Sequence, residues 1–507
     1  MLTSSKNITA LLILLFIAVR LLFVQYPFWG LEYEDSFIYT DTGRYLGFDY
    51  DYKSMPFKCQ SCLDGSYVNC YQYGSFGGHF LSIPFILASI NSIFGYHHFN
   101  IFILNFVFSL FIVGFVIFFW DRFKLKDTFS LNLFLLLLVV TPFISIFNTS
   151  GLAETVSSFF VLGFVFLIYK TNESDFNYKS SVFWLVIIFL FLAVATKREN
   201  FILLILLYSI PFIRYFFKQK PLTKSYIFLV LISSLTLFIF SIYIGLFDIE
   251  NNEGGDIGSK TFSLDFLIIN LKQFLIAITN ISYWGLTGFA FVFSIAFAIY
   301  YNKINKLGLM CLLLSVSYII LYSSHYRSYY QVVYNLSHPF ETLRYSVNYL
   351  PLIALFISTL KLKFDISSLQ NVIYKRILKV SFILTTFVLI LNVVKTRIEF
   401  SQDEKISRIQ PVKDILSISS VNDIIITDIP IVFHCYADEK QKIVDVFSLS
   451  EKRFQELINL TNNTIIYFLK PRDMAINTDR YGIKFNTNNF KKVVFDSRNF
   501  DLLKYSK

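Results

Sequence analysis

The stretch ITALLILLFIAVRLLFVQYPFWGLEYEDSF, residues 8–37, joins an apolar run to a cluster of carboxylates. An α-helix needs about 20 apolar residues to cross the hydrocarbon core of a bilayer. Residues 8–27 supply them, with Arg20 as their one charged side chain. We therefore expect a first span in which Arg20 faces protein or snorkels to the interface. The acids that follow either form a solvated loop or do chemistry at the membrane edge.

Similar apolar runs recur along the 507 residues, of which 55% are hydrophobic and only 16% charged. A soluble protein carries about 25% charged residues, so the sequence predicts a mostly α-helical, polytopic membrane protein. The formal net charge of +10 does not indicate a nucleic-acid partner, because basic residues are expected in cytoplasmic loops. We expect eleven spans, at residues 8–27, 98–119, 129–147, 152–169, 182–195, 200–217, 225–247, 276–300, 307–323, 345–360 and 377–394.

Lysine and arginine are concentrated in the loops around and after the even-numbered spans, whereas the first loop, residues 28–97, is rich in acids. The positive-inside rule then predicts a cytoplasmic amino terminus, an external 28–97 loop and an external chain after residue 395. Within that loop, residues 74–97 are apolar but broken by Gly, Pro and His. We expect one or two short surface helices there, because a span would reverse the side of every later loop.

The composition changes near residue 396, at the end of a predicted transmembrane domain of residues 1–395. Short β-rich runs appear, namely DIIITDIP, KIVDVF, TIIYFLK and KKVVFD. Between two of them, SLSEKRFQELINLT has a serine start signal and helical spacing of its apolar residues. Strands that alternate with a helix predict a small external α/β domain over residues 396–507. It contains no glycine-rich phosphate loop.

Cysteines concentrate in the first loop, at Cys59, Cys62 and Cys70. Outside the cytoplasm the expected fate of such cysteines is a disulfide. A zinc site needs four ligands, and these cysteines supply three, with His79 as a conceivable fourth. The disulfide is favoured over zinc, and the partner of the leftover thiol stays open, with Cys435 as one candidate.

Two acidic features are candidates for chemistry. Glu34 and Asp35 follow the first span by a few residues, where a carboxylate pair can act as general base or bind a divalent cation such as Mg or Mn. The ordinary alternative is a solvated loop. Glu154, in NTSGLAET, lies about a turn into an apolar helix, where an ionisable group is costly and usually functional. The alternative is a helix-start acid favoured by the helix dipole, with Ser150 as the cap.

Two cationic features are predicted on the same external face. Lys197 and Arg198, in ATKRENF, lie in a short outer turn and suit a phosphate or diphosphate head group, although anchoring to membrane lipid uses the same chemistry. The stretch SSHYRSYYQVVYNLSHPFETLRYSVNYLPL, residues 323–352, brings Arg327, Arg344 and many tyrosines, among them Tyr345. Its alternative is an aromatic belt at the interface.

A carboxylate base and several cations on one face suit a substrate with a lipid tail in the membrane and a phosphate at the interface. Lipid-linked sugar transfer fits this description. The carboxylate deprotonates the acceptor, which attacks the sugar C1, and the Lys and Arg groups stabilise the departing phosphate as its charge grows.

The order of these motifs resembles that of GT-C-fold glycosyltransferases that use polyprenyl-phosphate sugars. The closest likeness is to bacterial relatives of protein O-mannosyltransferases and aminoarabinose transferases. YEDSFIYTDTGRYL resembles their acidic motif, residues 77–123 resemble a surface helix followed by a span and a basic turn, and SGLAET, ATKREN and RYSVNYLPLIAL look like the later junctions. The likeness covers most of residues 8–394, and the tail is similar to the external α/β cap of some relatives.

The resemblance implies an inverting transferase in a bacterial inner membrane, with its active site outside. The donor would be an undecaprenyl- or dolichyl-phosphate-linked sugar, and a metal could be required. Three departures stand out. Glu34 takes the place of the usual first Asp, so the base is either Glu34 or Asp35. GGH, ending at His79, replaces a His-Pro-Pro-like turn, and the three-cysteine insert has no counterpart.

Two other functions fit parts of the pattern. A polysaccharide polymerase or ligase would place its key Arg and His in a long late loop, and residues 324–344 leave that open. A transporter or flippase of lipid-linked saccharides would also use external cations, but with charges or broken helices deep within spans. Because the candidate residues gather at one face, the order is glycosyltransferase, then polymerase or ligase, then transporter.

Overall fold

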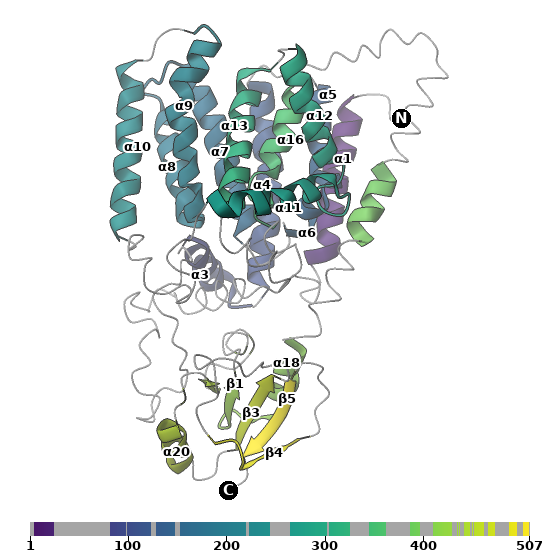
Figure 1. Cartoon of the computed structure of the whole chain (residues 1–507), viewed down its shortest axis with the longest axis vertical. Coiled ribbons are helices and arrows are strands. Elements are labelled where there is room, and N and C mark those ends of the chain that lie inside the picture. Colours follow the sequence, from purple (N-terminus) through teal and green to yellow (C-terminus); the bar gives the residue numbers. More distant parts are fainter. Residues whose placement is uncertain are drawn as a thin grey trace. The chain divides into compact units, whose positions relative to one another are not determined.

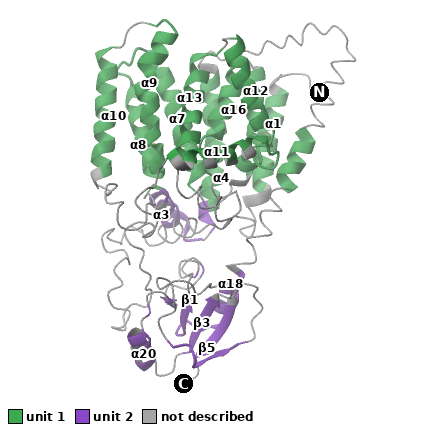
Figure 2. Ribbon diagram, in the orientation of Figure 1, with its two compact units in different colours: residues 1–27, 80–82, 102–398 green, residues 28–79, 83–101, 399–507 purple. Residues whose placement is uncertain are grey.

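The computed structural model describes two compact units of this chain, coloured separately in Figure 2. The described residues of the first unit lie within 1–27, 80–82 and 102–398, and those of the second within 83–101 and 399–507. The structure describes residues 5–24, 82–97, 99–122, 128–147, 153–219, 223–243, 264–301, 304–324, 344–360, 386–395, 409–427, 433, 436, 441–446, 449, 451–460, 465–471, 486–493 and 500–505.

The first unit consists of helices, and Figure 1 shows α7, α8, α9, α10 and α13 running side by side. The elements are α1 Ser5–Val24, α4 Asn100–Arg122, α5 Thr128–Val140, α6 Pro142–Phe147, α7 Glu154–Glu173, α8 Ser181–Thr196, η2 Arg198–Ile202, α9 Leu203–Phe216, α10 Lys224–Tyr243, α11 Leu264–Thr279, α12 Leu286–Tyr301, α13 Lys306–Ser323, η4 Arg344–Asn348 and α16 Leu350–Thr359. A further short apolar helix covers Thr386–Lys395.

Five helices in the described residues are long and apolar enough to cross a membrane: Asn100–Trp120, Glu154–Glu173, Arg198–Phe216, Lys224–Ser241 and Lys306–Ser323. Others, such as α8, α12 and α16, are apolar but shorter. The expected class, a mostly α-helical polytopic membrane protein, is confirmed.

The span expected over residues 129–147 is divided into α5 and α6 at Pro142. Proline has no N–H, so the carbonyl of Leu138 lacks its usual donor four residues later. Arg20 of α1 replaces that donor, because its Nη2 lies 3.2 Å from the Leu138 oxygen. Its guanidinium also lies 3.4 Å above the Phe16 ring, and the side chain is fully buried. Arg20 therefore faces protein, and its positive charge lies at the carboxyl end of α5, where the helix dipole favours it.

The span expected over residues 276–300 is wrong at its start. Residues 264–279 form a separate helix, α11, which lies across the direction of its neighbours in Figure 1, and α12 begins only at Leu286. The turn and the first residues of α12 each need a glycine. Gly285 has a φ of +59°, and a Cβ on Gly288 would lie 2.0 Å from the carbonyl oxygen of Ile278. Glycine therefore allows the two backbones to touch.

The second unit contains most of α3, Ser82–Phe94, which confirms the expected short helix within residues 74–97. The helix ends at Phe94, and the next residue, Gly95, has a φ of +82°. The Asn100 side chain fixes this end, since its Nδ2 donates to Asn91 Oδ1 at 2.8 Å and to the Gly95 carbonyl at 3.1 Å.

The carboxyl-terminal part of the second unit is a small α/β fold with a five-stranded sheet in the order β2-β1-β3-β5-β4. Strands β2 and β3 are parallel to β1, and β5 is antiparallel to β3 and β4. The expected four strands and one helix are present, and β5 and α18 are additional. The elements are α18 Ile409–Ile418, β1 Ile424–Thr427, β2 Lys442–Asp445, α20 Glu451–Leu460, β3 Ile466–Pro471, β4 Phe490–Lys492 and β5 Phe500–Tyr505.

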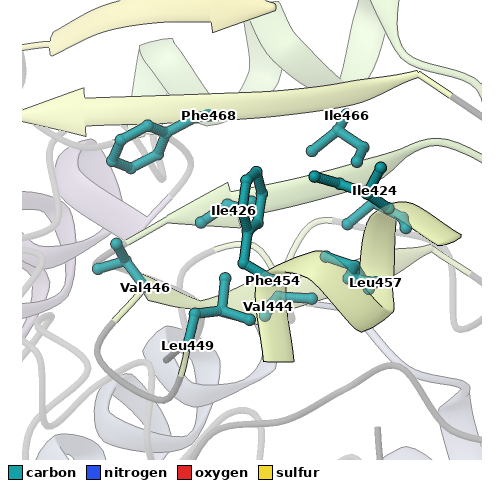
Figure 3. Close-up of a cluster of buried hydrophobic side chains, with 10 residues drawn as sticks. Ile424, Ile426, Val444, Val446, Leu449, Phe454, Leu457, Ile466 and Phe468 are labelled. Atoms are coloured by element: carbon teal, nitrogen blue, oxygen red, sulfur yellow. The ribbon is translucent and has the colours of Figure 1, made fainter. Parts of the chain in front are cut away.

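Strand β1 is buried on both faces, as expected for a central parallel strand. Ile424 and Ile426 pack with Phe454 and Leu457 of α20 in the cluster drawn in Figure 3. Ile425, on the opposite face, packs with the α18 residues Val412 and Ile415. Successive strand residues point to opposite faces, so one run of isoleucines fills two cores.

Candidate active site

A buried ion pair joins two junctions that the sequence singles out. Lys197 Nζ lies 3.0 Å from Glu154 Oε1, and the two side chains are 9% and 3% exposed. Glu154 is the first residue of α7, and Lys197 is the C-cap residue directly after α8. Each charge therefore lies at the helix end whose dipole favours it. The cap at Ser150, part of the alternative interpretation of Glu154, is wrong, because Ala153 occupies the N-cap position of α7 and makes no side-chain cap.

Two tyrosines flank the same ammonium group. Lys197 Nζ lies 4.4 Å from the centroid of the Tyr345 ring and 5.9 Å from that of Tyr322. The two rings stack with their centroids 4.9 Å apart and only 4° between their planes. A cation this close to an aromatic face is attracted by the ring quadrupole. The structure thus brings Glu154, Lys197 and Tyr345 together from three separate stretches of sequence.

Asn200 of η2, fully buried, connects the surrounding helices through four hydrogen bonds. Its Nδ2 donates to Ser157 Oγ of α7 and to the carbonyl of Ala193 of α8, both at 2.7 Å. Its Oδ1 accepts from the Tyr318 hydroxyl of α13 at 2.7 Å and from Asn348 Nδ2 of η4 at 2.9 Å. Ser157 Oγ in turn donates to Asn348 Oδ1 at 2.5 Å. We call these four side chains, Asn200, Ser157, Tyr318 and Asn348, the asparagine network.

The short helix η4 has two further attachments. Ser158 Oγ donates to the carbonyl of Val347 at 2.6 Å, and the indole N–H of Trp284 donates to Ser346 Oγ at 3.0 Å. The segment that carries Arg344 and Tyr345 is therefore fixed against α7 and the α11–α12 turn. The side chains of this region come from the start of α7, the end of α8, η2, the end of α13 and η4, so they form one polar layer at one end of the helices.

The other predicted residues have different positions. Arg198, half-buried, begins η2 directly after Lys197, and Arg344 begins η4. Eight lie outside the described residues: Glu34, Asp35, Cys59, Cys62, Cys70, His79, Arg327 and Cys435. Within the described residues, no group of three or more His, Cys, Asp or Glu side chains could hold a metal ion.

Sequence reasoning missed the asparagine network, although a weak signal existed. Asn200 belongs to the singled-out ATKREN stretch, and Ser157 comes three residues after Glu154, so both lie at suspected junctions. Asn348 also lies in a singled-out stretch, RYSVNYLPLIAL. Tyr318 gives no such signal, because an isolated tyrosine in an apolar helix is ordinary.

The fold defines a polytopic membrane protein with a small α/β domain at its carboxyl end. The chain is similar to ArnT from Cupriavidus metallidurans bound to undecaprenyl phosphate, with a TM-score of 0.58, 12% identity and 97% of each chain covered. Against ArnT in the apo state the TM-score is 0.54, with 11% identity and again 97% of each chain. No protein-family model and no curated protein matches the sequence. The expected GT-C fold is confirmed, and identities this low establish the fold alone.

Proposed function

We propose that this chain is an integral-membrane glycosyltransferase that moves a sugar from a polyprenyl-phosphate-linked donor to an acceptor lipid, glycan or protein. One observation carries the proposal. Glu154, Lys197 and Tyr345 meet in a buried polar layer, in a fold shared over 97% of both chains with a protein whose structure holds undecaprenyl phosphate. The proposed setting is a bacterial inner membrane, with the polar layer and the carboxyl-terminal domain on the external side.

The proposed chemistry uses one carboxylate from the first loop. Glu34 or Asp35 takes the proton of the acceptor hydroxyl or amine, and the freed lone pair attacks the sugar C1. The bond between C1 and the phosphate oxygen breaks, and the polyprenyl phosphate leaves with that electron pair. Attack from the face opposite the phosphate inverts the configuration at C1.

The cations of the polar layer have different roles in this proposal. Glu154 already matches the charge of Lys197, so this pair adds little net charge to the layer. Arg198 and Arg344, at the starts of η2 and η4, are the cations proposed to meet the growing charge of the leaving phosphate. Lys197 contacts the ring of Tyr345, the residue that follows Arg344 in η4. His79 and Arg327 stay proposed substrate contacts on sequence grounds.

A transfer assay with radiolabelled polyprenyl-phosphate sugars in membranes tests the proposal. We expect Glu34→Gln or Asp35→Asn to reduce transfer roughly 100-fold or more, the usual contribution of a general base. Asp41→Asn, in the same loop, is the matched control and should retain transfer. Added EDTA tests whether the acidic pair also holds Mg or Mn. If both carboxylate variants transfer at the wild-type rate, or no sugar leaves any lipid donor, the proposed mechanism is wrong.

The cations need a second design, because removing one partner of a buried ion pair costs about 3–5 kcal/mol of stability on its own. Glu154→Gln with Lys197→Met removes both charges together and so separates folding from turnover. Arg198→Gln leaves the pair intact. We expect Arg198→Gln to lower kcat more than the double variant does, and the opposite order would reassign the phosphate contact to Lys197.

A further inference from the structure

The helix α7 carries charged layers at both of its ends. It runs from Glu154 to Glu173, so at 1.5 Å per residue its 20 residues extend about 30 Å, the thickness of the hydrocarbon core. Glu154 belongs to the polar layer described above. The opposite end, with Glu173 and the α7–α8 turn, is a second region of charge that the proposed transfer reaction does not use.

Two acids at this second end each form an ion pair with a more deeply buried cation. Arg214 Nη2 lies 2.7 Å from Asp175 Oδ1, and Lys306 pairs with Glu173. Both cations are nearly buried, at 5% and 9% exposure, whereas the acids are half exposed. The two carboxylates therefore leave little net negative charge on this surface.

Three lysines on the α7–α8 and α9–α10 turns have no such ion-pair partner. Lys179 lies on the α7–α8 turn, and Lys218 and Lys224 lie at the two sides of the α9–α10 turn. All three are exposed, and within the described part of the chain none of them makes an ion pair. Their charges are therefore available to an outside partner.

The two turns are held together, so the lysines share one surface. Thr223 Oγ1 donates to the Asp175 carbonyl at 3.0 Å, and the rings of Phe176 and Tyr226 meet edge to face. Lys218 has a φ of +50°, a left-handed backbone that is uncommon for a lysine. The bonds from its own N–H to the Tyr215 carbonyl and from Gln219 N–H to the Arg214 carbonyl hold that conformation.

Large amphipathic aromatic side chains lie in the α7–α8 turn, at the start of α8 and at the end of α9. Tyr215 is 84% exposed, Tyr178 50% and Trp184 43%. Tyr and Trp prefer the level of the lipid head groups, where the ring is half in hydrocarbon and the polar atom is wet. We call Lys179, Lys218 and Lys224 with these three aromatics the lysine–aromatic surface.

We propose that the lysine–aromatic surface binds the phosphate groups of anionic phospholipids in the adjacent leaflet. The chemistry is complementary. Three unmatched ammonium groups face the head-group level, and the ring side chains beside them fit the boundary between head groups and acyl chains. This inference does not depend on the proposed transfer reaction.

The test measures lipid binding to the purified full-length protein by native mass spectrometry, with phosphatidylglycerol against phosphatidylcholine. About 1 kcal/mol per lysine at a membrane surface corresponds to about 5-fold in affinity. We therefore expect K179Q/K218Q/K224Q to lose roughly 100-fold in phosphatidylglycerol affinity. The control K452Q/K491Q/K504Q removes the same charge from exposed lysines of the carboxyl-terminal domain and should bind like wild type.

Two outcomes would overturn the proposal. One is equal binding of the two lipids by the wild-type protein. The other is equal phosphatidylglycerol binding by the surface and control variants. Circular dichroism on every variant accompanies the measurement, and a surface variant that loses affinity with an unchanged helix signal supports the proposal.

Discussion

Replacing Asn200 by alanine tests the energetic weight of the asparagine network. The variant removes four hydrogen bonds and leaves two buried donors without acceptors, the Tyr318 hydroxyl and one N–H of Asn348. The Ser157 hydroxyl keeps its bond to Asn348, and the Ala193 carbonyl keeps the N–H of Lys197. Each orphaned buried donor costs about 1–3 kcal/mol, so we expect the free energy of unfolding to fall by about 2–6 kcal/mol.

A second substitution tests whether the orphaned donors cause this loss of stability. Tyr318→Phe removes one of the two orphaned donors, so the double variant Asn200→Ala/Tyr318→Phe should be about 1–3 kcal/mol more stable than Asn200→Ala alone. Tyr318→Phe by itself should destabilise the protein by about 0.5–1.5 kcal/mol, the net value of one ordinary hydrogen bond. Tyr318→Phe should therefore destabilise the wild-type protein but stabilise the Asn200→Ala variant. This change of sign is expected only if the orphaned hydroxyl causes the loss of stability.

The assay is SDS-induced unfolding in mixed micelles, followed by tryptophan fluorescence. Asn392→Ala is the control, because that side chain makes one exposed hydrogen bond, to the Ile281 carbonyl at 3.0 Å. It should change stability by less than about 1 kcal/mol. If Asn200→Ala costs no more than this control, or if the double variant is no more stable than the single, the reasoning from buried donors is refuted.

Three further predictions concern the fold. Arg20→Leu should lower the free energy of unfolding by about 1–3 kcal/mol in the same assay, because it leaves the Leu138 carbonyl unpaired. The loss should be smaller in a Pro142→Ala background, where the new N–H supplies the donor. Equal losses in the two backgrounds would contradict the pairing. Gly288→Ala should cost about 1–3 kcal/mol because its Cβ would meet the Ile278 carbonyl, whereas Gly114→Ala, with nothing within 4 Å, should be neutral or stabilising. Ile426→Ala should destabilise the carboxyl-terminal domain by about 2–5 kcal/mol, seen as faster amide exchange in β1 and β3, whereas exchange in the helices of the first unit should not change.

Several features of the protein could be predicted from the sequence because they depend on local patterns. Apolar length predicts membrane helices, and the spacing of Phe454 and Leu457 predicts the helix that became α20. Breaks at Gly and Pro predict a short α3 in place of a span. The same rules missed the division at Pro142 and the separate helix α11, since their apolar residues blend into the neighbouring runs.

The contacts within the candidate site could not be predicted from local sequence patterns. The sequence singles out Glu154 and Lys197 as two unusual charges, 43 residues apart, but it does not say that they neutralise each other. It marks the ATKREN junction but not that Asn200 binds Tyr318, 118 residues away. Which helix ends meet, and which donor meets which acceptor, depends on how the helices pack. Only the tertiary structure decides that, because a buried polar group must find its partner wherever the fold brings one within about 3 Å.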